Sequence, residues 1–351
     1  MAGQIYDTTT LLSVVRQERV ITPFWLNFFN SQINFDTEDI AFDRVNMDYR
    51  RLAPFVAPNV QGRVQKLSGY DTVSFKPAYV KPKDVVDPNM VIPRQPGEAL
   101  GSGSLSLAQR RDAVIAEILR QHRVKLTNRN EWLAARAIID GTVTISGEDY
   151  PSVTVNFRRH SSLSYLPTGT ARWTQNGSAP MTDIRTAKQN AFNRSGAKIT
   201  KLIFGATAWD LFTTRVDIKE FMNRNYGGYD ANITRLYDAY EGQEFLGYIS
   251  GSNGGGRMEC WLDTSKYVDD AGSEQYFLDQ GTVVGVGSNI EGVRCFGAIK
   301  DFDAQLRPLE MFPKMWRNED PSVEYLLTQS APLMVPKRPN ASFKIKVNGD
   351  S

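Results

Sequence analysis

The sequence predicts an α+β protein with one segment that projects from its body, and three features indicate this. Apolar side chains recur at helical spacing over residues 105–140, and shorter stretches of alternating polarity follow along the chain. A proline-rich stretch, residues 75–90, contains Pro77, Pro82 and Pro88 and cannot form a helix. Because prolines are confined to sheet edges, we expect this extended, cationic stretch to find partners outside itself.

The composition is that of an ordinary globular protein. The chain has 351 residues, of which 41% are hydrophobic and 23% charged, enough for two or three domains. Its 41 basic and 39 acidic residues give a net charge of +2, which disfavours a dedicated nucleic-acid binder. No apolar run approaches the roughly 18 residues that span a membrane, and no signal peptide is evident. Cys260 and Cys295 lack metal-ligand spacing and indicate buried, unpaired thiols in a reducing cytosol.

Two segments before residue 100 leave their partners open. The aromatic cluster at 23–29 is expected either in the core or docked on a neighbouring subunit. Residues 60–79 alternate loosely, and we predict a hairpin arm that returns through the proline-rich stretch to about Pro96. An isolated hairpin is only marginally stable in water, so this one should lean on another surface.

The long helix is predicted over Leu105–Asp140, with Ser104 or Ser106 as its N-cap and Gly141 at its C-terminus. Thr127-Asn128 is a candidate interruption. The helix carries six arginines, at Arg110, Arg111, Arg120, Arg123, Arg129 and Arg136. A solvated face that makes ion pairs is favoured over a stripe for an anionic partner, which would contact only phosphates.

Beyond the helix, the pattern predicts a small α/β domain and then strands to the end of the chain. The predicted elements are a hairpin of 142–145 with 153–157, a helix opening at 182–183 and closed by Gly196, a strand at 199–204, a helix at 207–225, a hairpin of 245–250 with 257–263, and a strand at 282–287. Residues 161–180 are predicted to form a loop or an exposed lobe.

No catalytic, cofactor-binding or metal-ligating residue emerges from the sequence. His122 is expected to be a buried structural histidine and His160 a solvated one. The glycine-rich run Gly251–Gly256 lacks the Lys-Ser/Thr ending of a phosphate loop and precedes a strand, so a hairpin turn is favoured. The acidic residues are expected to be solvated loop charges, because calcium-loop spacing is missing; they are Asp263, Asp269, Asp270, Glu274 and Asp279.

Several short stretches occur in an order that resembles the major capsid proteins of tailed bacteriophages, and in detail the lambda-like major head protein family. They are Phe75–Lys83, Asp87–Met90, Asp303–Gln305, Phe312–Trp316 and Gln329–Met334. The resemblance implies a Hong Kong 97-type fold. It also implies a head protein that self-assembles into hexamers and pentamers of an icosahedral shell around packaged double-stranded DNA.

The same resemblance implies a division of the chain. It comprises an N-terminal arm (1–60), an extended loop or E-loop hairpin (61–103), a peripheral or P-domain with a spine helix and strands (104–182), an axial or A-domain (183–305) and return strands of the P-domain (306–351). The E-loop would lie over a neighbouring subunit and contact it through Lys66, Lys76, Tyr79, Lys81 and Lys83. Covalent linkage of such lysines to Asn340 or Asn348 of a neighbour is the less favoured alternative.

The resemblance further implies separate scaffold, portal and decoration proteins, non-specific proximity to DNA, no membrane and no cofactor. The protein would reside in the virion after assembly in the host cytoplasm, and it would not be an enzyme. Two other functions stay open: an α/β enzyme that uses the glycine-rich turn 251–256, and another structural component of the virion.

Overall fold

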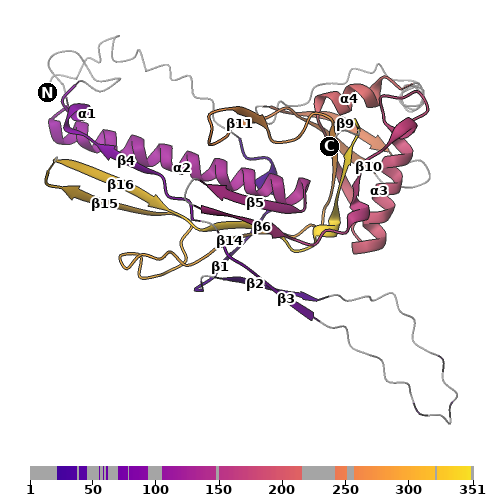
Figure 1. Ribbon diagram of the computed structural model, residues 1–351, viewed down its shortest axis with the longest axis horizontal. Helices are drawn as coiled ribbons and strands as arrows, with labels where there is room; N and C mark the ends of the chain where they lie inside the picture. The colour runs from indigo at the N-terminus through magenta and orange to yellow at the C-terminus, as the bar shows by residue number, and fades with distance from the viewer. Residues whose placement is uncertain are drawn as a thin grey trace, which may run out of the picture.

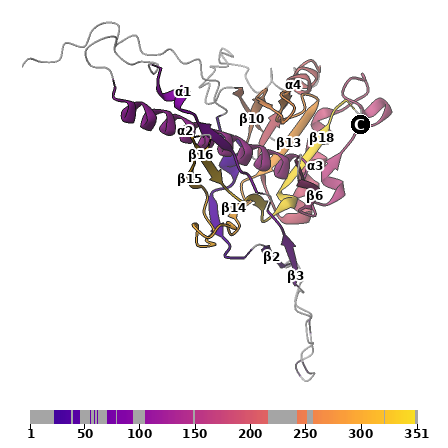
Figure 2. The same cartoon turned by 60° about the vertical axis from the view of Figure 1, so that its left-hand side comes forward.

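The computed structural model describes residues 22–45 except 38, 70–93 except 78, 105–147, 150–215, 242–250, 257–320 and 322–348, with the single positions 55, 58 and 61. A long helix, α2 (Leu107–Ile139), runs along one side of the body. One end of α2 lies over a three-stranded sheet, and the other end meets a six-stranded sheet flanked by two helices (Figures 1 and 2). This mixture confirms the predicted α+β class.

The long helix α2 is continuous over 33 residues. It begins with a capping box, in which the Gln109 N–H donates to Ser106 Oγ (3.3 Å) and the Ser106 N–H donates to Gln109 Oε1 (2.9 Å). Thr127 donates its hydroxyl to the Arg123 carbonyl, so the predicted interruption is wrong. Gly141, at φ 69°, ends the helix as predicted; a Cβ there would lie 2.9 Å from that of Arg159.

The sheet below α2 has the order β15 (Phe312–Asn318), β16 (Val323–Gln329) and β4 (Lys83–Val86), all antiparallel. After β4, the short helix α1 (Pro88–Val91) is capped by the Asp87 carboxylate. A second three-stranded sheet follows the order β1 (Ser31–Asn34), β14 (Gly292–Phe296) and β17 (Pro332–Pro336).

The six-stranded sheet has the order β7-β18-β13-β8-β10-β9. The strands span β7 Ser164–Tyr165, β8 Ile199–Phe204, β9 Gln243–Ser250, β10 Arg257–Asp263, β13 Thr282–Gly287 and β18 Ser342–Lys346. Helices α3 (Pro180–Ser195) and α4 (Ala206–Thr213) accompany it. The predictions for β8, β13, α3 and the β9–β10 hairpin are confirmed. The helix predicted over 207–225 ends at Thr213 instead, and residues 216–225 lie outside the described residues.

Three small sheets and turns complete the described chain. They are the pairs β2 (Ile40–Val45) with β3 (Tyr70–Phe75), β5 (Thr142–Gly147) with β6 (Tyr150–Asn156), and β11 (Lys266–Val268) with β12 (Glu274–Tyr276), and the 3₁₀ turns η1 (Trp25–Phe28), η2 (Ser161–Leu163), η3 (Gly169–Ala171) and η4 (Pro339–Ala341). The β5–β6 hairpin confirms the predicted strand pair.

The predicted pairing of the arm is wrong. Strand β3 pairs with the upstream strand β2, with Val45 opposite Tyr70, and not with the proline-rich stretch. That stretch runs back along the body, where Val80 bridges Ser330 and β4 joins β16. Lys83–Val86 pairs regularly because it lies between Pro82 and Pro88 and contains no proline itself. The projecting hairpin is therefore β2–β3, which points away from the body in Figure 1.

The final strands also divide differently from the expected return to one domain. Strands β15 and β16 lie below α2, whereas β18 pairs with β13 and β7 in the six-stranded sheet. Gly285 of β13 lies opposite Phe343 of β18 and faces its ring, since a Cβ there would be 2.2 Å from the ring carbons. The close approach accounts for glycine in the middle of a buried strand.

Two buried clusters form the core. The first joins the C-terminal half of α2 to the aromatic cluster at 23–29, where Phe24, Trp25, Leu26 and Phe29 are buried. Of the two positions expected for this cluster, the core of its own chain is the one observed. The second cluster lies in the six-stranded sheet and includes Trp173, so part of the predicted exposed lobe is core. Cys260 and Cys295 are buried and unpaired, as expected, and burial raises the pKa of each thiol to about 12.

Candidate assembly surfaces

The described part of the chain contains no group of three or more His, Cys, Asp or Glu side chains arranged to hold a metal ion. No helix among the described residues is long and apolar enough to cross a membrane. The glycine-rich run at 251–256 lies outside the described residues; the strands on either side of it form an antiparallel hairpin.

The proline-rich stretch is fixed to the spine helix by His122. This histidine is fully buried on α2, and its ring nitrogens lie 2.8 Å from Thr328 Oγ1 of β16 and 2.9 Å from Asp84 Oδ2 of β4. Burial opposes ionisation of Asp84, but the hydrogen bond from His122 and the charge of Lys125 lower its pKa below 3.8. The prediction of a buried structural histidine is confirmed, and its partner Asp84 was not foreseen.

We predict that His122→Ala destabilises the subunit by about 2–4 kcal/mol, because it leaves Thr328 Oγ1 without a partner and opens a cavity. Urea unfolding followed by tryptophan fluorescence measures this. His160→Ala is the matched control and should cost less than about 1 kcal/mol. Contrary to expectation, His160 is not simply solvated, since its Nδ1 accepts the Ser162 N–H at 3.2 Å, but it is only half-buried. Equal losses in the two variants would contradict the anchoring role of His122.

The structure separates the predicted contact residues. Lys66 lies outside the described residues, and Lys76 is exposed just after β3. Tyr79 is held within its own chain, since its hydroxyl donates to the Ala298 carbonyl (2.6 Å) and accepts the Lys300 N–H (3.1 Å). The Lys81 ammonium lies 4.9 Å from the centre of the Tyr79 ring. Tyr79 thus braces the proline-rich stretch against the body, and any contact of these residues with a neighbour stays a proposal.

Lys83 belongs to an aromatic cluster on the face of the β15–β16–β4 sheet opposite α2. Its ammonium lies 4.1 Å from the centre of the Tyr325 ring and 5.2 Å from that of Trp316. The two rings stack at 5.4 Å. Period-two alternation places Lys83 and Tyr325 on one face, while Asp84 and Thr328 turn to His122 on the other. The cluster gives this sheet face an apolar, cationic character.

A braced loop between β14 and β15 exposes a large aromatic side chain. Phe302 is 90% exposed, and Leu306 nearby is 51% exposed. The preceding residue, Asp301, accepts hydrogen bonds from Lys314 Nζ (3.1 Å), Gln329 Nε2 (2.8 Å) and the Asp303 N–H (2.9 Å). A rigid loop with an apolar tip is typical of a protein contact. Nothing in the local sequence distinguishes Phe302, so the sequence did not reveal it.

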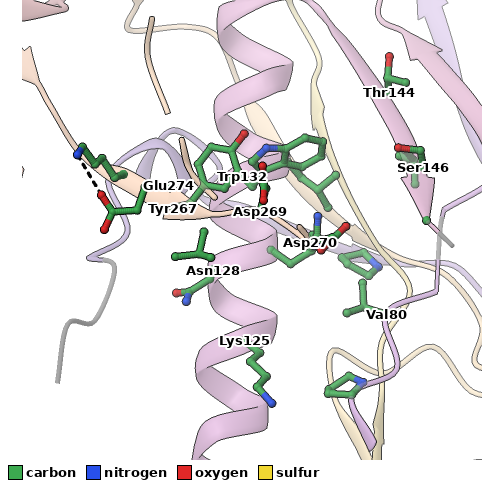
Figure 3. Close-up of a pocket in the computed structure, with 18 of the residues that line it drawn as sticks. Val80, Lys125, Asn128, Trp132, Thr144, Ser146, Tyr267, Asp269, Asp270 and Glu274 are labelled. Carbon is green, nitrogen blue, oxygen red and sulfur yellow. Dashed lines mark hydrogen bonds and ion pairs between the residues drawn. The ribbon is translucent and has the colours of Figure 1, made fainter. Parts of the chain in front are cut away.

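A cleft of 1140 Å³ lies beside α2, between β5 and the β11–β12 hairpin (Figure 3). Trp132 and Tyr267 supply apolar walls. The charged groups at its rim are paired: Arg129 with Asp270 at 2.7 Å, and Lys266 with Glu274 at 3.0 Å. With Arg111–Glu324 and Arg120–Glu117, these contacts support the ion-pair interpretation of the helix arginines.

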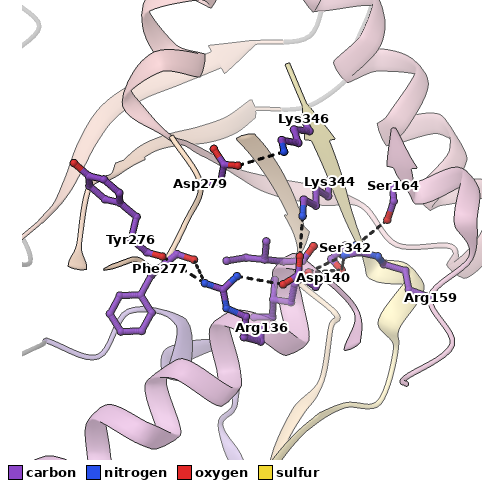
Figure 4. A network of polar contacts seen from close by, with 12 residues as sticks. Arg136, Asp140, Arg159, Ser164, Tyr276, Phe277, Asp279, Ser342, Lys344 and Lys346 are labelled. Carbon is purple, nitrogen blue, oxygen red and sulfur yellow. Dashed lines mark hydrogen bonds and ion pairs between the residues drawn. The ribbon is translucent and has the colours of Figure 1, made fainter. Parts of the chain in front are cut away.

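The end of the spine helix is joined to the six-stranded sheet by a polar network (Figure 4). Asp140 binds Lys344 of β18 at 2.7 Å and Arg136 at 3.3 Å. Arg136 also donates to the Phe277 carbonyl at 3.1 Å. The guanidinium of half-buried Arg159 donates to the Ile138 and Ile139 carbonyls, at 2.8 and 2.9 Å. Burial lowers the pKa of Arg159 to about 10, which is still far above neutral pH. The network sets how the helix and this sheet are joined.

The fold is similar to that of two solved structures from phages or prophages. The crystal structure of a candidate capsid protein from a prophage of Escherichia coli CFT073 aligns over 93% of each chain, with a TM-score of 0.65 and 23% identity. A subunit of the mature capsid of bacteriophage PhiM1 aligns over all of this chain and 93% of its own, with a TM-score of 0.56 and 12% identity. The fold is therefore the Hong Kong 97-like fold of phage capsids.

Curated relatives match the sequence of this chain over almost its whole length. The major capsid protein of Escherichia phage lambda is 27% identical over 348 residues, which are 98% of this chain and 99% of the relative. That of Escherichia phage N15 is 26% identical over the same shares. Residues 7–347 match the family described as phage major capsid protein E, and the chain belongs to that family.

Proposed function

We propose that the chain assembles with copies of itself into hexamers and pentamers of an icosahedral phage head that encloses double-stranded DNA. The observation that supports this most directly is the β2–β3 hairpin. Its base is anchored, since Ile40 is fully buried and the Phe75 ring packs 5.8 Å from that of Phe157. From that base the hairpin extends away from the body (Figure 1), where a lone subunit offers it no surface.

Electron microscopy of the purified chain, expressed alone and with the genes that neighbour its own, tests the proposal. Shells, rings or capsomers are expected, because head-to-tail contacts between identical subunits close into rings. A chain that stays monomeric at every concentration and in both expression contexts would contradict assembly.

We expect Phe302→Asp to weaken assembly and leave folding unchanged. An exposed apolar side chain adds little to the stability of the subunit, whereas a charge at a buried contact is costly. The measurement is the assembled fraction by sedimentation, with thermal unfolding of the subunit alongside. Phe192→Asp is the control, because Phe192 is also exposed (54%) but lies on α3. Normal assembly of the Phe302 variant would remove this loop from the contact surface.

The roles assigned to segments and partners are part of the same proposal. The hairpin that includes β2 and β3 would act as the E-loop, α2 as the spine helix, and the six-stranded sheet as most of the A-domain. Exposed lysines of the proline-rich stretch, Lys76 and Lys81, would contact a neighbouring subunit without a covalent bond. Separate scaffold, portal and decoration proteins would complete the head in the host cytoplasm. The near-neutral net charge suits a shell that does not bind its DNA tightly. No step in this function requires a catalytic group or a cofactor.

A further inference from the structure

The first segment of the described chain is held by a buried carboxylate on the spine helix. Glu131 of α2 is 1% exposed, and it accepts the backbone N–H groups of Phe24 (2.8 Å), Trp25 (2.7 Å) and Leu26 (2.8 Å). These N–H groups lie at the start of η1, where the helical turn itself supplies no acceptor. Three hydrogen bonds to one carboxyl group therefore fix the segment Phe24–Phe29 to the helix.

A second buried carboxylate holds the same segment from another direction. Asp263, at the end of β10, is fully buried and accepts the Trp25 indole N–H at 2.9 Å. It also accepts hydrogen bonds from the Gln243 side chain (3.2 Å) and the Ser265 N–H (3.0 Å). The expectation that Asp263 is a solvated loop charge is wrong. Trp25 thus joins the spine helix to the six-stranded sheet through two acidic side chains.

The other charged groups around this segment do not form an ion pair with Glu131. Arg294 of β14 donates to the Phe29 carbonyl (2.8 Å) and the Leu26 carbonyl (3.3 Å), at the opposite end of η1. Lys201 of β8 lies over the Phe28 and Trp261 rings, 5.6 Å from each centre, and pairs with Glu259 at 3.4 Å. On α2 itself, Arg129 pairs with Asp270. Two carboxylates thus share one buried region.

We propose that Glu131 and Asp263 form a proton-dependent latch, which holds Phe24–Phe29 between the spine helix and the six-stranded sheet when a proton is bound and loosens when the proton leaves to solvent. Burial supports this coupling, because both carboxyl groups are almost completely enclosed and no described cation forms an ion pair with either, which disfavours the ionised state. The segment lies at the start of the described chain, so the latch would control how firmly this start is held against the core.

The direction of the pH effect follows from the ionisation of Glu131. Burial, with a smaller contribution from the Asp263 charge, raises the pKa of Glu131 from 4.5 to about 7 despite its three N–H donors. Burial likewise raises the pKa of Asp263 above 3.8. The closed latch therefore binds a proton more tightly than the open one, so opening becomes more favourable as pH rises from about 4.5 to about 7.

Hydrogen exchange of the full-length chain tests the latch at the backbone N–H groups of Phe24, Trp25 and Leu26. After correction for intrinsic exchange, protection should fall by roughly tenfold per pH unit between pH 5 and pH 7. Sedimentation at each pH ensures that one assembly state is compared throughout. Protection that is unchanged over this range would overturn the proposal.

Two substitutions separate the latch from a general effect of pH on folding. Glu131→Gln and Asp263→Asn should each flatten the pH dependence at Phe24–Leu26, even if their protection is lower at every pH. Asp183→Asn is the matched control, because Asp183 also accepts an indole N–H, that of Trp173 at 2.8 Å, far from η1. It should leave the slope intact. Slopes like that of the unsubstituted protein in both latch variants would overturn the proposal, and so would a slope lost in the Asp183 variant. If the Glu131 variant does not fold, the Asp263 variant decides.

Discussion

Replacement of residues 46–69 by an Asn-Gly turn is expected to give a folded subunit that forms no shells. Val45 and Tyr70 are paired across β2 and β3, so two residues suffice to close the hairpin with a tight turn. The anchored base, Ile40 and Phe75, is retained. Thermal unfolding of the variant should match that of the unsubstituted subunit, while electron microscopy and sedimentation should show no assembled particles.

The end points of the replaced segment, residues 46 and 69, determine what the experiment can show. A deletion that extended through residues 66–93, as the sequence alone would suggest, would also remove β4, Asp84 and Tyr79. Those residues pair with β16 and contact His122 and Ala298, so their loss would unfold the subunit for reasons unrelated to assembly. Shells formed by the shorter variant would exclude the hairpin as an assembly element. An unfolded shorter variant would show that 46–69 belongs to the core.

The elements that the sequence predicted well are those whose signal is local. Helix α2 carries a capping box and apolar spacing, and β8 and β13 are short apolar runs between turn residues. The predicted pairing of the arm was wrong because strand pairing depends on residues far apart in the sequence. The alternation around β3 was visible, but its partner β2 lies well upstream, in a stretch whose sequence is compatible with either irregular or edge-strand structure. The prolines correctly indicated that β4 lies at the edge of a sheet, but they did not indicate which sheet it joins.

The buried charges were missed for a related reason. Asp263 was expected to be a solvated loop charge because calcium-loop spacing is missing, yet it is covered by Trp25, 238 residues away. Glu131 lies among polar and charged helix residues, and only the packing of η1 turns it inward. The enclosure of such groups depends on contacts that form between distant segments. The resemblance to phage head proteins supplied the function, since the residues of the chain contain no chemistry that does so.

Arg159 is expected to be the residue whose loss most weakens the junction between the spine helix and the six-stranded sheet. The sequence alone does not single out Arg159, because it is one of two adjacent arginines before a loop. Its guanidinium caps the last carbonyls of α2 and also donates to Ser164 Oγ at 2.9 Å. The side chain is half-buried, so water has limited access to these contacts.

Arg159→Met keeps much of the apolar volume and removes every donor, so it should lower the free energy of unfolding by about 3 kcal/mol. Arg159→Lys should recover only part of this, since a single ammonium cannot span two carbonyls and a hydroxyl as a planar guanidinium does. Urea unfolding gives both values, and exposed Arg185→Met, within about 0.5 kcal/mol of the unsubstituted protein, is the control. The loss should be the same at pH 6 and pH 8, because Arg159 stays charged throughout. A cost for Arg159→Met no larger than that for Arg185→Met would mean that the helix end is held by Asp140 and Lys344 alone.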